Sequence, residues 1–253
     1  MKITIIGSGQ VATVLGRKIL SKGHDVVQVF SQTKAHAQTL ASEFHCAYTS
    51  QWEELDLSAD LFIAAISDHA LPELAGKLRL PNKLIVHTAG SVSIELLKPV
   101  SKNYGVVYPL QSVRKELKEI PPLPLLVDGN REDSLTLIAD FAKSISSEVK
   151  QAGDTERLKL HLAAVIVNNF SNHLYAMTED FCEKEQVEFK LLWPLISETA
   201  HRIQKLSPAK AQTGPAVRQD EETIQAHLAM LENYPGLHNL YGTLTRSIER
   251  AMK

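Results

Sequence analysis

Short apolar runs alternate with segments of helical periodicity through the first part of the chain. Residues 3–6 form the first run, and Val11, Leu15 and Ile19 then share one face of a helix. The same alternation predicts strands at residues 25–30, 46–48, 61–66, 83–87, 105–108, 125–127 and 147–150, and helices at residues 34–44, 71–78, 94–100 and 132–144. Such alternation is typical of a parallel sheet covered by helices on both faces. Residues 61–66 are apolar throughout, which predicts a central strand.

The rest of the chain shows helical periodicity only. Helices are predicted at residues 154–185, 189–206, 220–233 and 236–252, with a loop at residues 207–219. A proline-rich stretch at residues 120–124 precedes the last two strands, and the change of pattern falls near Gly153. We therefore expect an α/β domain over residues 1–152 and an all-α domain over residues 153–253.

A glycine-rich turn, Gly7-Ser8-Gly9-Gln10-Val11-Ala12, joins the first strand to the first helix. In the pattern G-x-G-x-x-A, the first glycine turns the chain sharply and the second lets a pyrophosphate approach the backbone. The free N–H groups of the helix N-terminus then attract the phosphates. An ordinary glycine turn is the alternative, but the position between a strand and a helix favours a dinucleotide site. We assign Gly7, Ser8, Gly9, Gln10 and Val11 to cofactor binding.

The end of the second strand bears on the choice between NAD and NADP. NAD sites commonly place a carboxylate there, on the ribose 2′-hydroxyl. The corresponding stretch, Phe30-Ser31-Gln32-Thr33-Lys34, has no carboxylate, and its hydroxyls and ammonium suit a 2′-phosphate. We assign Ser31, Gln32 and Lys34 to the cofactor and expect NADP, with NAD as the alternative. A solvated loop with an incidental lysine is the other interpretation.

Polar residues follow several later strands at their carboxyl ends, where doubly wound sheets bind ligands. The residues at this edge are Ile66, Ser67, Asp68, His87, Thr88, Ser91 and Gln111. We assign Ile66, Ser67, Asp68 and His87 to the cofactor. His87 is also a candidate proton donor, and Ser91 a candidate for positioning the substrate.

The long helix predicted at residues 154–185 carries a polar stripe within an apolar sequence. Helical spacing puts its members on one face: His161, Asn168, Asn172, Tyr175 and Glu179. The apolar neighbours Leu160, Leu162, Val165, Ile166, Val167 and Phe170 are expected to be buried. The stripe either faces a ligand cleft between the domains or forms a structural hydrogen-bond network. We assign His161 and Asn168 to catalysis and Asn172 to the substrate, and interpret Tyr175 and Glu179 as structural.

The loop Thr213-Gly214-Pro215-Ala216-Val217-Arg218-Gln219-Asp220 is a second candidate site. Glycine and proline restrict its conformation, and Asp220 is placed to cap the next helix. Arg218 is therefore a candidate for binding an anionic group of the substrate. An ion pair with Asp220 or Glu222 is the alternative.

Composition narrows the class of protein. The 253 residues are 44% hydrophobic and 22% charged with a net charge of −2, so nothing suggests nucleic acid as a partner. The two cysteines, Cys46 and Cys182, have no metal-ligand spacing and suit a reducing compartment. No apolar run is long enough to span a bilayer, and Met1-Lys2 leads directly into the first strand. We expect a soluble cytoplasmic protein without a metal.

These stretches together resemble the bacterial Rossmann-like proteins that carry a C-terminal helical domain of unknown function. That group is similar to pyrroline-carboxylate reductase, deazaflavin-dependent NADP reductase and the β-hydroxyacid dehydrogenases. The matching segments are Gly7 to Ala12, His87 to Ser91, Tyr108 to Ser112, His161 to Asn169 and Thr213 to Asp220. The resemblance implies a Rossmann-type nucleotide domain, a helical substrate and dimerisation domain, and a homodimer formed through the C-terminal helices. It implies no particular substrate.

The chain departs from these relatives at two positions. NADP-binding relatives often have an arginine after the second strand, where this chain has Gln32. The β-hydroxyacid dehydrogenases place a catalytic lysine four residues before an asparagine, where this chain has Ala164 and Val165. Their mechanism therefore does not transfer, and His161 is the substitute candidate.

Two functions are compatible with this pattern. The first is an NADP-dependent oxidoreductase that reduces a small C=O or C=N substrate in a cleft between the domains, with His161 or His87 as proton donor and Asn168 and Ser91 as positioning groups. The second is a non-catalytic NAD(P)-binding sensor or scaffold, which the missing lysine favours.

Overall fold

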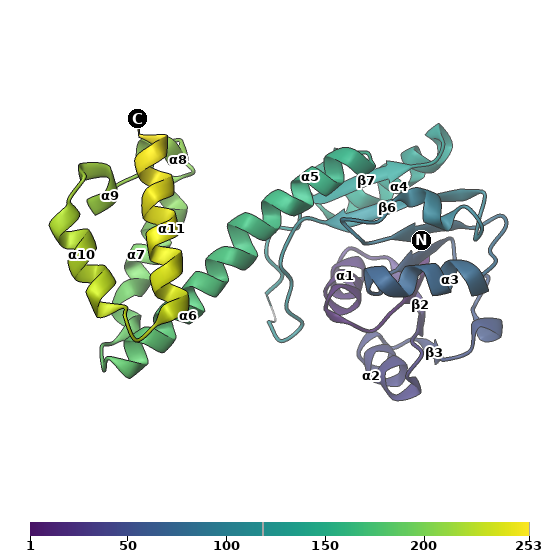
Figure 1. Cartoon of the computed structure of the whole chain (residues 1–253). Helices are drawn as coiled ribbons and strands as arrows, with labels where there is room; N and C mark the ends of the chain where they lie inside the picture. Colours follow the sequence, from purple (N-terminus) through teal and green to yellow (C-terminus); the bar gives the residue numbers. More distant parts are fainter. Residues whose placement is uncertain (118, 253) are drawn as a thin grey trace. The chain divides into compact units, whose positions relative to one another are not determined.

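The computed structural model describes residues 1–117 and 119–252. Its first part is an eight-stranded sheet with the order β3-β2-β1-β4-β5-β6-β7-β8 (Figure 1). The strands are β1 (Lys2–Ile6), β2 (Asp25–Phe30), β3 (Ala47–Thr49), β4 (Leu61–Ala64), β5 (Leu84–His87), β6 (Asn103–Pro109), β7 (Leu125–Gly129) and β8 (Val149–Gln151). The order reverses direction beside β1, as in a dinucleotide-binding fold. The predicted Rossmann-type domain is confirmed, with β4 in the middle of the sheet.

Helices cover both faces of this sheet (Figure 1). They are α1 (Gln10–Ser21), α2 (Lys34–Phe44), α3 (Leu71–Lys77) and α4 (Glu132–Ile145), with the short turns η1 (Trp52–Glu54), η2 (Asp68–Ala70) and η3 (Ile94–Leu97). One apolar cluster joins the strands to α1, α2 and α4 through residues such as Leu15, Phe44 and Phe141. The other joins them to α3 and η3 through residues such as Leu74 and Leu97. Because both faces are buried, the central strand β4 is apolar at every position.

One strand pair differs from the fully parallel sheet expected. β6 and β7 are antiparallel, whereas the pairs from β3 to β6 and the pair β7–β8 are parallel. A parallel connection needs a crossover, usually a helix, to return the chain to the starting edge. The proline-rich connection between β6 and β7 has no such helix in its described residues, so the chain turns back at the same edge.

The second part of the chain is helical, as predicted. The elements after the sheet are α5 (Asp154–Ala164), the π-helical segment η4 (Val165–Phe170), α6 (Ser171–Lys184), η5 (Phe189–Leu192), α7 (Trp193–Arg202), α8 (Pro208–Ala211), α9 (Pro215–Arg218), α10 (Glu221–Met230) and α11 (Pro235–Ala251). The loop expected at residues 207–219 contains the two short helices α8 and α9. Asp220 caps α10 by accepting a hydrogen bond from the Thr223 backbone N–H at 3.1 Å, as expected.

The chain divides into two compact units, Met1–Asn168 and Asn169–Lys253. The sequence placed its domain boundary at residue 153, where the last strand gives way to α5. The first unit extends further because Arg157 in the second turn of α5 is fully buried among residues of the sheet domain. The division therefore falls inside η4, and each unit is described by itself.

Several apolar residues of α5 and η4 are exposed, contrary to expectation. Leu162, Ile166, Val167 and Phe170 are between 50% and 72% exposed. Leu160 and Val165 are half-buried. The prediction that these neighbours of the polar stripe are buried is therefore wrong for Leu162, Ile166, Val167 and Phe170 in the single chain.

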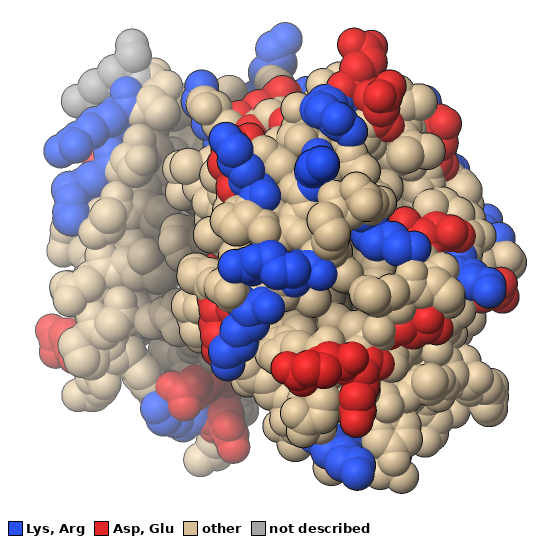
Figure 2. Space-filling model, turned by 90° about the vertical axis from the view of Figure 1, so that its right-hand side faces the viewer, with Lys and Arg blue, Asp and Glu red and all other residues tan. Residues whose placement is uncertain are grey.

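None of the described helices combines the length and the apolar character needed to cross a membrane. Basic and acidic side chains are interspersed over the face of the molecule that Figure 2 draws. That face therefore carries no broad patch of a single charge.

Candidate cofactor and substrate site

The turn between β1 and α1 has the backbone geometry that a dinucleotide site requires. Gly7 has φ = +123°, and a Cβ there would lie 2.2 Å from the Ala65 carbonyl oxygen. A Cβ on Gly9 would instead meet nothing within 4 Å. No side chain caps α1, and its first turn has no acidic residue, so its N–H groups are available to an anion. Gly7 therefore shapes the turn, while Gly9 keeps the space in front of it free.

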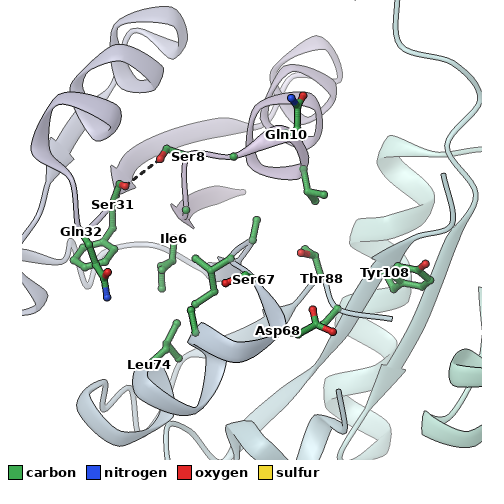
Figure 3. Close-up of a pocket in the computed structure, with 18 of the residues that line it drawn as sticks. Ile6, Ser8, Gln10, Ser31, Gln32, Ser67, Asp68, Leu74, Thr88 and Tyr108 are labelled. Atoms are coloured by element: carbon green, nitrogen blue, oxygen red, sulfur yellow. Dashed lines mark hydrogen bonds between the residues drawn. The ribbon is translucent and has the colours of Figure 1, made fainter. Parts of the chain in front are cut away.

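A cavity of about 560 Å³ opens at this turn and follows the carboxyl edge of the sheet within the first unit. Figure 3 shows Ser31 and Gln32 at one end, Ser8 and Gln10 near the glycine turn, and Thr88, Asp68 and Tyr108 towards the other end. The Ser8 hydroxyl donates to the Ser31 hydroxyl at 3.0 Å and thereby joins the turn to the end of β2. The cavity is elongated in the direction that a dinucleotide needs in this fold.

Most of the predicted cofactor residues line this cavity. They are Gly7, Ser8, Gly9, Gln10, Val11, Ser31, Gln32, Ile66, Ser67 and Asp68. Sequence analysis did not assign the lining residues Thr33 and Trp52 to the cofactor. The Trp52 indole stacks on Phe30 with 3.9 Å between ring centroids, which forms an apolar wall beyond the end of β2. Only the fold brings the short turn η1 to that position, so sequence spacing gave no signal for Trp52.

Lys34 is exposed and does not line the cavity. It is the first residue of α2, next to the lining residue Thr33. Glu73 of α3 brings a carboxylate to the same end of the site, where it accepts from Gln32 Nε2 at 3.3 Å and from Lys77 Nζ at 2.7 Å. The charged groups at this end of the cavity therefore come from α2, which carries Lys34, and from α3, which carries Glu73 and Lys77. The loop after β2 contributes uncharged polar groups.

His87 is fully buried and does not line the cavity. Its Nδ1 accepts from the Ala89 backbone N–H at 3.1 Å, so in the neutral ring the proton lies on Nε2, which has no partner among the described groups. Burial, and then the charge of Arg157, lower the pKa of His87 to about 4. A ring that is neutral and sealed from the cavity is poorly placed to donate a proton, so the structure argues against both the catalytic and the cofactor role predicted for His87.

The cavity ends at a hydrogen-bonded pair of aromatic side chains. Tyr108, near the end of β6, and His161 on α5 both line the cavity, and the Tyr108 hydroxyl lies 2.9 Å from His161 Nδ1. Gly90 lies beneath them, and a Cβ there would be 2.8 Å from both His161 Nδ1 and Tyr108 Cζ. Burial, and then the charge of Asp68, raise the pKa of Tyr108, which favours the tyrosine as donor and leaves the imidazole proton on Nε2.

Two other predicted residues, Ser91 and Asn168, do not line the cavity. The Ser91 hydroxyl donates a short hydrogen bond to the Asp68 carboxylate, so it fixes the direction of that carboxylate. Asn168 is exposed and lies outside the lining. Sequence analysis missed Tyr108 as a site residue, although it is next to the last residue of a strand that ends at the functional edge. The rule that selected Ser67 and Asp68 also applies to Tyr108.

Buried Arg157 forms an ion pair with partly exposed Asp154 at the start of α5. Arg157 Nη2 lies 2.7 Å from Asp154 Oδ1 and also donates to the Val92 carbonyl. Partial burial opposes ionisation of Asp154, but hydrogen bonds from Ser93, Arg157 and Ile94 outweigh it and lower the pKa of the carboxyl group. This pair joins α5 to the segment after β5 and so fixes the position of His161 one turn later.

The remaining predicted substrate residues belong to the second unit. Asn172 is exposed on α6, and Arg218 ends α9 with Nη2 3.8 Å from Asp220 Oδ2. The ion pair considered as the alternative for Arg218 is therefore present. The roles of Asn172 and Arg218 at a cleft between the units stay predictions. Among the residues the structure describes, no cluster of side chains suits a metal ion.

Comparisons with known families match the nucleotide-binding part and the helical part of the chain separately. A family described as NADP oxidoreductase coenzyme F420-dependent matches residues 2–90, and a domain of unknown function, DUF2520, matches residues 123–248. A crystal structure from Bacteroides fragilis, provisionally assigned as an NADP oxidoreductase, is 36% identical over 98% of both chains, with a TM-score of 0.91. The chain belongs to this NADP oxidoreductase family.

More distant solved structures share the fold of the family. A 1-pyrroline-5-carboxylate reductase from Streptococcus pyogenes is 15% identical, with a TM-score of 0.67 over 100% of this chain and 98% of its own. An imine reductase from Myxococcus stipitatus, in complex with NADP+, is 15% identical, with a TM-score of 0.68 over 99% of this chain and 95% of its own. No curated protein gives a significant match.

Proposed function

We propose that the protein is an NADP-dependent reductase that acts on a small C=O or C=N substrate at the end of the cavity formed by Tyr108 and His161. The observation that carries this proposal is the continuity of one cavity from an anion-binding glycine turn to a hydrogen-bonded proton donor. The imine reductase of similar fold that was solved in complex with NADP+ supports a nicotinamide cofactor. A reduced nicotinamide would supply the hydride, and the protein would bind and orient the cofactor and the substrate and protonate the substrate.

The residues at the two ends of the cavity have distinct tasks. Gly9 and the N-terminus of α1 bind the pyrophosphate, and Ser31 and Thr33 bind the adenosine end. At the other end of the cavity, the Tyr108 hydroxyl donates to His161 Nδ1. This hydrogen bond fixes the orientation of the imidazole ring and therefore the direction of its Nε2–H. When His161 takes up a second proton, the bond reverses and Nδ1–H donates to the Tyr108 oxygen. The imidazolium then delivers a proton from Nε2 to the oxygen or nitrogen of the substrate as hydride reaches the carbon.

The preference for NADP over NAD rests on the groups at the ribose end. The loop after β2 has hydroxyls and no carboxylate, and Lys34 stands at the first position of α2. Lys77 offsets the charge of Glu73, the carboxylate that approaches from α3. A 2′-phosphate therefore meets hydroxyls, an ammonium and the positive end of a helix.

Hydride transfer from NADPH deuterated at C4, measured over a panel of ketones, keto acids and cyclic imines, tests the reaction. Deuterium in one reduced product supports the proposal. NADPH binding without transfer to any of them would identify a nucleotide sensor instead. Fluorescence titration of both cofactors tests the preference, and Lys34→Ala should weaken NADPH by about fivefold while leaving NADH unchanged, because only the phosphate contact is lost.

We propose in addition that the protein works in the cytoplasm as a homodimer formed through its C-terminal helices. Free Cys46 and Cys182 suit a reducing compartment. Exposed apolar side chains on α7, such as Trp193 and Leu195, support association of two copies.

A further inference from the structure

The cavity has an unusual balance of charge. Of the described residues that line it, Asp68 is the only one with a carboxylate, and neither lysine nor arginine contributes. Asp68 is the first residue of η2, the short turn that follows β4. Figure 3 shows its carboxylate beside Thr88 and on the side of Tyr108. The Ser91 hydroxyl donates to this carboxylate and holds its orientation. The reactive end therefore presents one fixed negative charge.

The nearest cation does not neutralise this charge. The Arg157 side chain is 1% exposed and its guanidinium is paired with Asp154 at 2.7 Å. No part of Arg157 lines the cavity. A substrate carboxylate bound beside Tyr108 would therefore meet Asp68 without a lysine or arginine of this lining to compensate, and like charges repel.

We propose that Asp68 selects a substrate that is positively charged at the reacting bond, a protonated imine or iminium ion, over ketones and keto acids. This inference rests on the proposed reductase function. Hydride adds to the iminium carbon, the π electrons of the C=N bond become the nitrogen lone pair, and the product is an amine. His161 supplies the proton when the imine arrives neutral, and the Asp68 carboxylate then stabilises the cation that forms.

The Asp68 carboxylate would stabilise a positive charge both before and after hydride transfer. Before transfer the positive charge lies on the substrate, and afterwards it lies on the oxidised nicotinamide. A substrate and a nicotinamide bound at the end of the cavity that Asp68 lines would both lie near this one fixed anion. A neutral ketone lacks this stabilisation in its ground state, so the preference for a cation appears in binding as well as in turnover.

Binding of unreactive cations tests this inference without catalysis. Pyrrolidinium and piperidinium are titrated into the NADPH-saturated protein, with cyclopentanol and cyclohexanol as neutral partners of the same ring size. We expect the wild-type protein to bind the ammonium ions more tightly than the alcohols. Asp68→Asn should weaken the ammonium ions about tenfold, equivalent to about 1.4 kcal/mol, and leave the alcohols and NADPH within about twofold.

Two further variants separate local from general effects. Asp68→Glu keeps the charge and should retain the ammonium preference. Asp25→Asn removes one charge from the exposed start of β2, at the opposite edge of the sheet, and should change nothing. The imine-to-ketone ratio of kcat/KM should fall with Asp68→Asn in parallel with the loss of ammonium binding.

The possible outcomes distinguish the inference from the function on which it rests. If the wild-type protein does not bind NADPH, the proposed function fails and the inference fails with it. If NADPH binds but the alcohols bind as tightly as the ammonium ions, or Asp68→Asn leaves ammonium affinity unchanged, the inference alone is overturned. Preferred turnover of keto acids by the wild-type protein would also overturn it.

Discussion

At the scale of single residues, the two histidines predicted as proton donors have opposite environments. His87 ends a strand at the functional edge, yet it is buried with Nδ1 bonded to the Ala89 N–H. His161 lies in a helix of mixed pattern, yet it lines the cavity and contacts Tyr108. The direction of each side chain, and not its place in the sequence, decides which imidazole can reach a ligand.

Replacing His161 with asparagine should abolish proton donation while leaving the cavity intact. We expect kcat to fall by about 10² to 10⁴, because the amide retains a polar contact for Tyr108 but does not transfer a proton. NADPH affinity and the melting temperature should stay close to the wild-type values. Earlier unfolding with unchanged activity per folded molecule would show that His161 is structural.

Burial of His87 predicts a dependence of stability on pH. Its pKa is about 4 in the folded protein and about 6.5 when unfolded, so the unfolded state binds more protons between these values. Stability is therefore fully present above pH 6.5 and falls as the pH drops towards 4, by about 3 kcal/mol in total. Urea unfolding across this range measures the slope. His87→Asn keeps an acceptor for Ala89 and should remove most of the slope; an unchanged slope would contradict the assignment.

At the scale of elements, the β1–α1 turn and the segment after β5 build the site from backbone geometry. Gly7 and Gly9 are two residues apart in one motif but are constrained differently. Gly7 has a positive φ and contacts the Ala65 carbonyl, whereas Gly9 has an ordinary φ of −84° and faces open space. One glycine is needed by the fold and the other by the ligand.

Alanine at each position should separate these requirements. Gly7→Ala should lower the free energy of unfolding by at least about 2 kcal/mol, because the Cβ clashes with backbone at an unfavourable φ. Gly9→Ala should change stability by less than about 0.5 kcal/mol and weaken NADPH at least about tenfold, because the methyl group occupies the space of the pyrophosphate. Thermal unfolding and NADPH titration measure the two effects; equal losses of stability would refute the distinction.

At the scale of the whole molecule, the two units differ in the extent of their cores. The first unit has two large apolar clusters, one on each face of its sheet. In the described part of the second unit, the buried apolar residues are Cys182, Ala216, Ile224 and Leu231. So small a core is insufficient for an isolated helical domain, which favours burial against a second copy of the chain.

Light scattering at micromolar concentration should therefore give the mass of two chains. Leu195→Glu introduces a charge into the exposed apolar face of α7 and should shift the protein towards the monomer. Leu57→Glu is the matched control, since Leu57 is 57% exposed in the first unit and Leu195 is 60% exposed in the second. A wild-type monomer, or equal behaviour of both variants, would refute dimerisation through this face.

The sequence by itself determined the elements and the position of the cofactor turn. Local periodicity reproduced β2 and α2 at both ends, and the glycine spacing identified the anion-binding turn, because these features depend on residues close together in the chain. The position of Ser67 and Asp68 just beyond a predicted strand likewise indicated that they belong to the site, because ligands bind at the carboxyl ends of the strands in a parallel sheet.

Only the tertiary structure decided which of the candidate groups meet. It placed Trp52 beside Phe30, turned His87 away from the cavity and joined Tyr108 to His161 across Gly90. It also made β7 antiparallel to β6, which no local pattern indicated. Each of these results depends on contacts between distant segments and on the direction of side chains after packing. Periodicity and spacing do not carry that information, because they record only which face of an element a residue occupies.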